Sequence, residues 1–142
     1  MSNFYLGRKS LSNLIGVYPE LGFIATEAIK ITSQDFTIFD GVRTDEEQRE
    51  MVNSGASITM DSYHLYGLAI DLVPWINGAA RWEEEPCKKV IVAIKEVIRA
   101  HGLEDIENGY DMWGWDLPHW QKSGYKEKYD FRRLDTFNLL EA

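Results

Sequence analysis

The strongest constraint on the fold of this chain is an amphipathic pattern between residues 86 and 100. Apolar side chains recur there every three or four positions, the spacing that places them on one face of a helix. They are Val90, Ile91, Ile94, Val97 and Ile98. Gly102 follows, and glycine is common just beyond a helix end. The chain is therefore expected to contain a helix that buries one face against a core.

Two more helices are predicted nearer the N-terminus. One begins at Pro19, a residue that suits the first turn of a helix, and ends near Thr32. The other begins after Thr44, because Thr44 and Glu47 have the spacing of a capping box. Gly55 is a suitable stop for this second helix.

Strands are predicted between the helices. Residues 36–39 are mostly β-branched or aromatic, and residues 68–73 form an apolar run that suits a buried strand. Asn77-Gly78 predicts a hairpin turn. The segment 106–120 is rich in Trp, Tyr and Gly, and we expect strand and loop there.

The order of these elements predicts the fold class. Helices and strands are mixed without regular βαβ alternation, which favours an α+β fold. A chain of 142 residues without a linker or internal repeat fits one domain, 1–142. Hydrophobic residues make up 44% and charged residues 27%, a balance that argues against disorder.

The formal net charge of −8 argues against nucleic acid as a partner. One basic cluster runs against this balance: Lys122, Lys126, Lys128, Arg132 and Arg133. Acidic residues interrupt it, so we interpret it as a solvated surface of mixed charge.

The compartment is also constrained by the sequence. No apolar run approaches the ~20 residues of a membrane span, and no secretory signal is recognised at the N-terminus. The single cysteine, Cys87, excludes an internal disulfide and suits synthesis in a reducing cytoplasm. We expect a monomer that does not insert into membranes.

Two of the three histidines occur where a metal site can form. His64 precedes the predicted strand and Asp71 lies in it, and Gly67 lets the backbone fold back so that the two side chains converge. With His119, they offer two imidazoles and one carboxylate, a set that suits Zn²⁺ and leaves a fourth position open for water. Asp71 and His119 are therefore expected on neighbouring strands of an antiparallel sheet, or at the ends of those strands.

Asp116 lies three residues before His119. In a turn or extended segment its carboxylate can face the water at the metal, take its proton and deliver it to a leaving amine. An ordinary turn residue is the alternative. Trp113 and Trp115 lie close to Asp116 in the sequence. Each is expected either to line a substrate groove or to pack in the core.

Two motifs resemble those of a zinc peptidase family. Residues 62–71, S-x-H-x-x-G-x-A-x-D, are similar to the signature of D-alanyl-D-alanine carboxypeptidases and L-alanyl-D-glutamate peptidases. Residues 115–121, W-D-x-P-H-W-Q, resemble the second motif of that family. Residues 36–44 look like a stretch of phage endolysins of the L-alanyl-D-glutamate type. The resemblance covers about residues 5–121 and leaves 122–142 unassigned.

The resemblance implies a role for each motif residue. It implies zinc on His64, Asp71 and His119, with Asp116 as catalytic acid and base. Arg43 matches a family arginine that binds a substrate carboxylate or the developing oxyanion, with a structural salt bridge as the alternative. Ser62 is assigned a hydrogen bond to a ligand residue or to substrate, and Gln48 a structural role. The implied fold is a small antiparallel sheet flanked by helices, as in hedgehog and D,D-peptidase domains.

The function implied is that of an endolysin, which cleaves a stem-peptide amide bond of bacterial peptidoglycan, L-alanyl-D-glutamate being the expected bond. Such an enzyme would wait in the host cytoplasm until a holin opens the membrane. A D-alanyl-D-alanine carboxypeptidase or dipeptidase is the alternative. A non-catalytic zinc-binding module is a third hypothesis, against which Asp116 argues.

Overall fold

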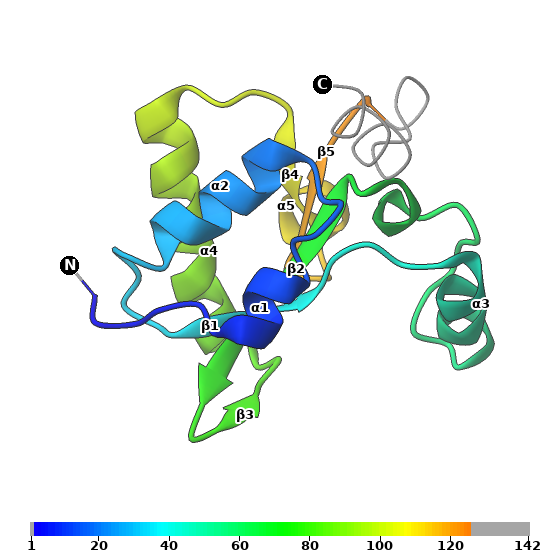
Figure 1. Cartoon of the computed structure of the whole chain (residues 1–142), viewed down its shortest axis with the longest axis horizontal. Helices are drawn as coiled ribbons and strands as arrows, with labels where there is room; N and C mark the ends of the chain where they lie inside the picture. The colour runs from blue at the N-terminus through cyan, green and yellow to red at the C-terminus, as the bar shows by residue number, and fades with distance from the viewer. Residues whose placement is uncertain (1, 126–142) are drawn as a thin grey trace.

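A computed structural model describes residues 2–125 of the chain (Figure 1). Its centre is a five-stranded antiparallel sheet in the order β1-β2-β5-β4, with β3 paired to the end of β2. The strands are β1 (Phe36–Asp40), β2 (Ala69–Ile76), β3 (Ala79–Ala80), β4 (Ile106–Asn108) and β5 (His119–Lys122). The helices are α1 (Arg8–Ser12), α2 (Pro19–Ala28), α3 (Asp45–Asn53), α4 (Glu84–His101) and α5 (Gly109–Trp113), with a 3₁₀ turn η1 (Tyr63–Tyr66). The predicted α+β class with a small antiparallel sheet is confirmed.

The hydrophobic core lies between one face of the sheet and the helices α2 and α4, which cross over it (Figure 1). Its largest fully buried side chains include Leu21, Ile24, Ile70, Ile94 and Trp120. Burying a side chain of this size contributes on the order of 1.5–3 kcal/mol. Because side chains alternate along a strand, Asp71 and His119 must point to the other face of the sheet.

The strongest local patterns were predicted correctly. The helix expected at 86–100 is α4, and Gly102 adopts the left-handed φ of 61° beyond its end. Thr44 and Glu47 form both hydrogen bonds of the capping box at the start of α3. The helix from Pro19 ends at Ala28 rather than near Thr32. Beyond Ala28 the chain continues in isolated turns, one of which is closed by a hydrogen bond from the Ile31 N–H to the Ala28 carbonyl.

Short elements were missed. α1 was not expected, and the segment 106–120 contains the helix α5 between its two strands. Both helices span only five residues, and neither length is stable without tertiary contacts. In α1, the buried Ser10 hydroxyl accepts from the Ile38 amide and bonds the Thr37 hydroxyl, so contact with β1 holds the turn in place.

The interpretation of the basic cluster was wrong for Lys122. This residue is only 4% exposed, and its ammonium donates to Glu20 Oε1 at 2.7 Å and to the Glu104 carbonyl at 2.6 Å. It thus links β5 to α2 instead of facing solvent. The other four residues of the cluster lie outside the described residues.

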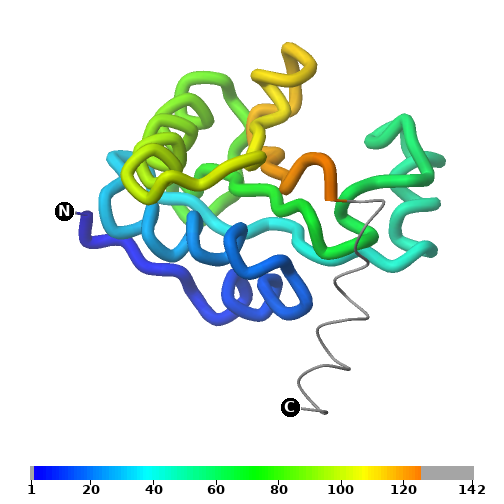
Figure 2. Tube along the Cα trace, turned by 90° about the horizontal axis from the view of Figure 1, so that it is seen from above, coloured from blue at the N-terminus to red at the C-terminus, as the bar shows by residue number. Residues whose placement is uncertain are grey.

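α3 stands apart from the layer formed by α2 and α4 in both views (Figures 1 and 2). It is followed by η1, which leads directly into β2. Within residues 2–125, no helix combines the length and the apolar character needed to cross a membrane.

Candidate metal centre

The three predicted ligand residues converge on the outer face of the sheet. Asp71 on β2 is paired directly with His119 on the antiparallel strand β5. His64 comes from η1, which ends at Gly67 with a left-handed φ of 71°. That conformation carries a steric cost for residues with a Cβ, so Gly67 is what allows the tight return of the chain from His64 into β2. One nitrogen or oxygen atom from each side chain lies within 4.8 Å of the others.

The donor atoms are arranged in a way that suits a cation. His64 Nε2 and His119 Nδ1 lie 3.3 and 3.5 Å from Asp71 Oδ1. This carboxylate oxygen is buried, yet it accepts no hydrogen bond among the described residues. Buried polar atoms are rarely left without a partner, and a bound ion is one established explanation. Two imidazoles and a carboxylate in this arrangement fit a zinc ion with one open position.

Hydrogen bonds on the far side of each imidazole orient the rings. His64 Nδ1 lies 2.8 Å from the Gly41 carbonyl oxygen, which can only accept, so this nitrogen carries the proton. His119 Nε2 lies 2.9 Å from Gln121 Oε1, which accepts in the same way. The lone pairs of His64 Nε2 and His119 Nδ1 are therefore left facing Asp71. Partners of this kind fix the tautomer of a metal-binding histidine.

The electrostatics of the cluster favour positive charge at its centre. Burial raises the pKa of Asp71, but the imidazoles of His64 and His119 outweigh this effect and hold its pKa well below the ordinary value. Burial lowers the pKa of His119, and the Asp71 carboxylate more than offsets it, so that pKa is raised. The same attraction would act on a divalent cation.

Asp116 is held beside this cluster by an unusual backbone. Its φ of 58° lies in the left-handed region, and its carbonyl oxygen accepts from the His119 amide at 3.2 Å. Burial, and then the charge of Asp71, raise the pKa of the Asp116 carboxyl. A carboxyl with a raised pKa is better suited to exchange protons near neutral pH than an ordinary aspartate.

Two residues that sequence reasoning missed position this turn. The buried Asn108 side chain donates to the carbonyls of Leu117 and His119, at 2.8 and 3.0 Å. A Cβ at position 109 would lie 2.4 Å from the Asp116 carbonyl oxygen, so only glycine fits there. Asn108 is the N-cap of α5, and the preference of helix starts for asparagine is the sequence signal that could have indicated its role.

Arg43 contacts the cluster through Asp71. The residue is 7% exposed, and its Nε donates to Asp40 Oδ2 at 2.6 Å while an NH group donates to Gln48 Oε1 at 2.8 Å. Its other terminal nitrogen lies 3.6 Å from Asp71 Oδ2. The structural salt bridge that the sequence left open is thus present, and contact of Arg43 with a substrate stays a prediction. Gln48 is fully buried and holds this arginine in place.

The remaining predicted residues surround the same face. The Ser62 hydroxyl accepts from the His64 amide at 3.2 Å and caps η1, so it positions a predicted ligand. Trp113 and Trp115 are about half exposed, and the Trp113 ring lies 5.2 Å from the His119 ring, centroid to centroid. Both tryptophans are accessible beside the cluster, and their contact with substrate stays a prediction.

Comparisons with known proteins give a consistent result for the chain as a whole. The family model described as phage L-alanyl-D-glutamate peptidase matches residues 1–136. The L-alanyl-D-glutamate peptidase of Escherichia phage T5 is 33% identical over 105 residues, which cover 72% of this chain and 74% of the relative. That of Listeria phage A118 is 41% identical over 85 residues, 59% of this chain but only 29% of the relative. The crystal structure of the Serratia marcescens L-Ala D-Glu endopeptidase ChiX superposes with a TM-score of 0.75 at 31% identity, covering 87% of this chain and 92% of that one.

Proposed function

This chain belongs to the phage L-alanyl-D-glutamate peptidase family, and we propose from that premise that it is a zinc-dependent endolysin. Its reaction is hydrolysis of the amide bond between L-alanine and D-glutamate in the stem peptides of bacterial peptidoglycan. The observation that carries the zinc requirement is the cluster of His64, Asp71 and His119, in which a buried carboxylate oxygen faces two imidazole nitrogens.

The residues around the cluster have different roles in the proposed reaction. A zinc ion bound there would polarise the scissile carbonyl and make a water molecule acidic near neutral pH. Asp116 accepts the proton of the attacking water and then donates it to the leaving amine of D-glutamate. The Gly41 carbonyl and Gln121 keep the two imidazoles oriented. Arg43 pairs with Asp71 Oδ2, the carboxylate oxygen that does not face the imidazoles.

Digestion of purified peptidoglycan by the zinc-loaded protein tests the scissile bond. We expect products whose new N-terminus is D-glutamate, identified by mass spectrometry after N-terminal labelling. Release of terminal D-alanine would instead support the carboxypeptidase hypothesis. A chain that binds zinc and leaves both bonds intact would support a non-catalytic module.

The biological setting is part of the proposal. The substrate lies in the cell wall, and the enzyme is proposed to accumulate in the host cytoplasm and to reach the wall once a holin opens the membrane. We propose that it acts as a monomer, since all three predicted ligands and Asp116 come from one chain.

Gln121 offers a test of how the second imidazole is oriented. We expect Gln121→Ala to weaken zinc binding by about 10–100-fold, because the His119 ring loses the acceptor that keeps Nδ1 facing Asp71. Competition with a coloured chelator measures this affinity. Gln121→Glu is the matched control, since it keeps an acceptor at the same place and the Ser123 hydroxyl beside it can rotate to donate. Equal affinities in the wild type and Gln121→Ala would show that other contacts orient the ring.

A further inference from the structure

We propose that a cavity along the free edge of β1 is a carbohydrate-binding subsite that holds the glycan strand of the wall polymer. The inference rests on the proposed function, because it supplies the sugar part of a substrate whose peptide part meets the metal centre. The residues that line this cavity are not among those assigned to catalysis above.

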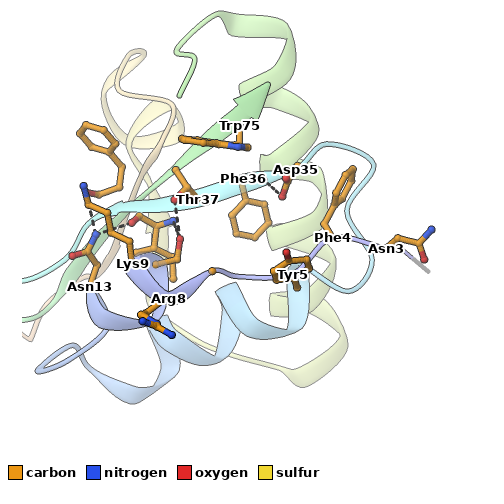
Figure 3. Close-up of a pocket in the computed structure, with 14 residues that line it drawn as sticks. Asn3, Phe4, Tyr5, Arg8, Lys9, Asn13, Asp35, Phe36, Thr37 and Trp75 are labelled. Carbon is orange, nitrogen blue, oxygen red and sulfur yellow. Dashed lines mark hydrogen bonds between the residues drawn. The ribbon is translucent and has the colours of Figure 1, made fainter. Parts of the chain in front are cut away.

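The cavity is formed by the N-terminal segment, α1 and the edge of the sheet (Figure 3). Its volume of about 570 Å³ falls within the range of small-molecule sites. Five aromatic side chains line it: Phe4, Tyr5, Phe36, Phe39 and Trp75. Tyr5 is 80% exposed, Phe39 52% and Trp75 40%. Several accessible aromatic rings around one hollow indicate a binding site rather than scattered surface residues.

The polar groups in the same wall match a sugar. One face of a pyranose ring is lined with C–H groups that pack against an aromatic ring, while its hydroxyl and acetamido groups need hydrogen-bond partners. Asn3, Arg8, Lys9 and Asp35 line the cavity and offer amide, cationic and carboxylate groups. Neither Arg8 nor Lys9 forms an ion pair within residues 2–125, so both are available to a ligand.

The strand edge argues against a peptide as the occupant. An extended peptide would add to β1 through main-chain hydrogen bonds. The Ile38 amide already donates to Ser10 Oγ at 3.0 Å, and its carbonyl accepts from Asn13 Nδ2 at 2.9 Å. The Phe36 amide donates to Asp35 Oδ1 at 2.9 Å. With these edge groups satisfied, recognition must come from side chains, as it does for sugars.

The cavity and the metal centre share strand β2, which contributes Trp75 to one and Asp71 to the other. Asp71, Val73 and Trp75 alternate along the regular strand β2 and so lie on one face, which places Trp75 roughly 13 Å from Asp71 at about 3.3 Å per residue. The Phe39 ring also contacts the Trp82 ring, edge to face, with centroids 5.1 Å apart. A polymer with peptides attached to its sugars can therefore contact both places at once.

A tetramer of N-acetylglucosamine is the probe, titrated into the full zinc-loaded chain and followed by tryptophan fluorescence and by nuclear magnetic resonance of the indole N–H groups. We expect saturable binding that Trp75→Ala and Tyr5→Ala each weaken about tenfold or more. Phe23→Ala is the matched control, because this exposed aromatic lies on α2 against His101 and does not line the cavity. Tyr5 is so exposed that its removal is not expected to disturb folding.

Two activity assays separate this inference from the proposed function. We expect Tyr5→Ala and Trp75→Ala to cleave a free stem peptide at the wild-type rate and to cleave intact peptidoglycan more slowly. Absence of tetramer binding, equal binding by the wild type and both variants, or binding of the stem peptide in this cavity would overturn the subsite. Failure of the wild type to cleave any stem peptide would instead overturn the proposed function.

Discussion

Asp116→Asn is expected to bind zinc as the wild type does and to lose about 10²–10⁴-fold in turnover. The amide keeps the size and reach of the carboxylate, but it cannot accept the proton of the attacking water. The left-handed backbone at this position suits asparagine as well as aspartate, so the turn before His119 should persist. Single-turnover cleavage of a soluble stem peptide measures the effect.

The matched control is Asp111→Asn. Asp111 lies on the nearby helix α5, is exposed and pairs with Lys95 at the surface, so its replacement should change turnover little. Wild-type turnover in Asp116→Asn with zinc bound would show that this residue only organises its loop. The general base would then have to be another group.

The other large effect is expected at the ligands themselves. His64→Ala should abolish zinc retention and peptidase activity together, since one of three predicted protein ligands is lost. Asp71→Asn should lower affinity and activity in parallel, because it removes the only negative charge of the ligand set and leaves a neutral amide between two imidazoles. Elemental analysis after dialysis, together with activity, distinguishes both variants from Asp116→Asn.

His101→Ala serves as the control for histidine replacement. His101 is exposed at the end of α4, where its ring packs against Phe23, and it is not part of the cluster. This variant should keep both zinc and activity. Full zinc occupancy in His64→Ala would contradict the proposed ligand set.

Elements whose signals are local were predictable from sequence. The apolar stripe of α4 and the capping box at Thr44 depend on residues three or four positions apart, so neighbours in the chain are enough to specify them. The metal motif was recognisable for a related reason, because Gly67 sits between His64 and Asp71 where the chain must turn. α1 was not predictable in this way, since contacts with the distant strand β1 stabilise it, and α5 is too short to show a periodic apolar pattern.

The sequence by itself determined the kind of fold, the three candidate ligands and the candidate base. Only the tertiary structure decided how they meet. The pairing of Asp71 with His119 depends on the register of two strands far apart in the chain, and a shift of one residue would turn Asp71 into the core. The Gly41 carbonyl beside His64, the Gln121 amide beside His119 and the left-handed turn at Asp116 likewise arise from packing. Residue types specify which chemistry is available, whereas long-range pairing sets the directions in which lone pairs and protons point.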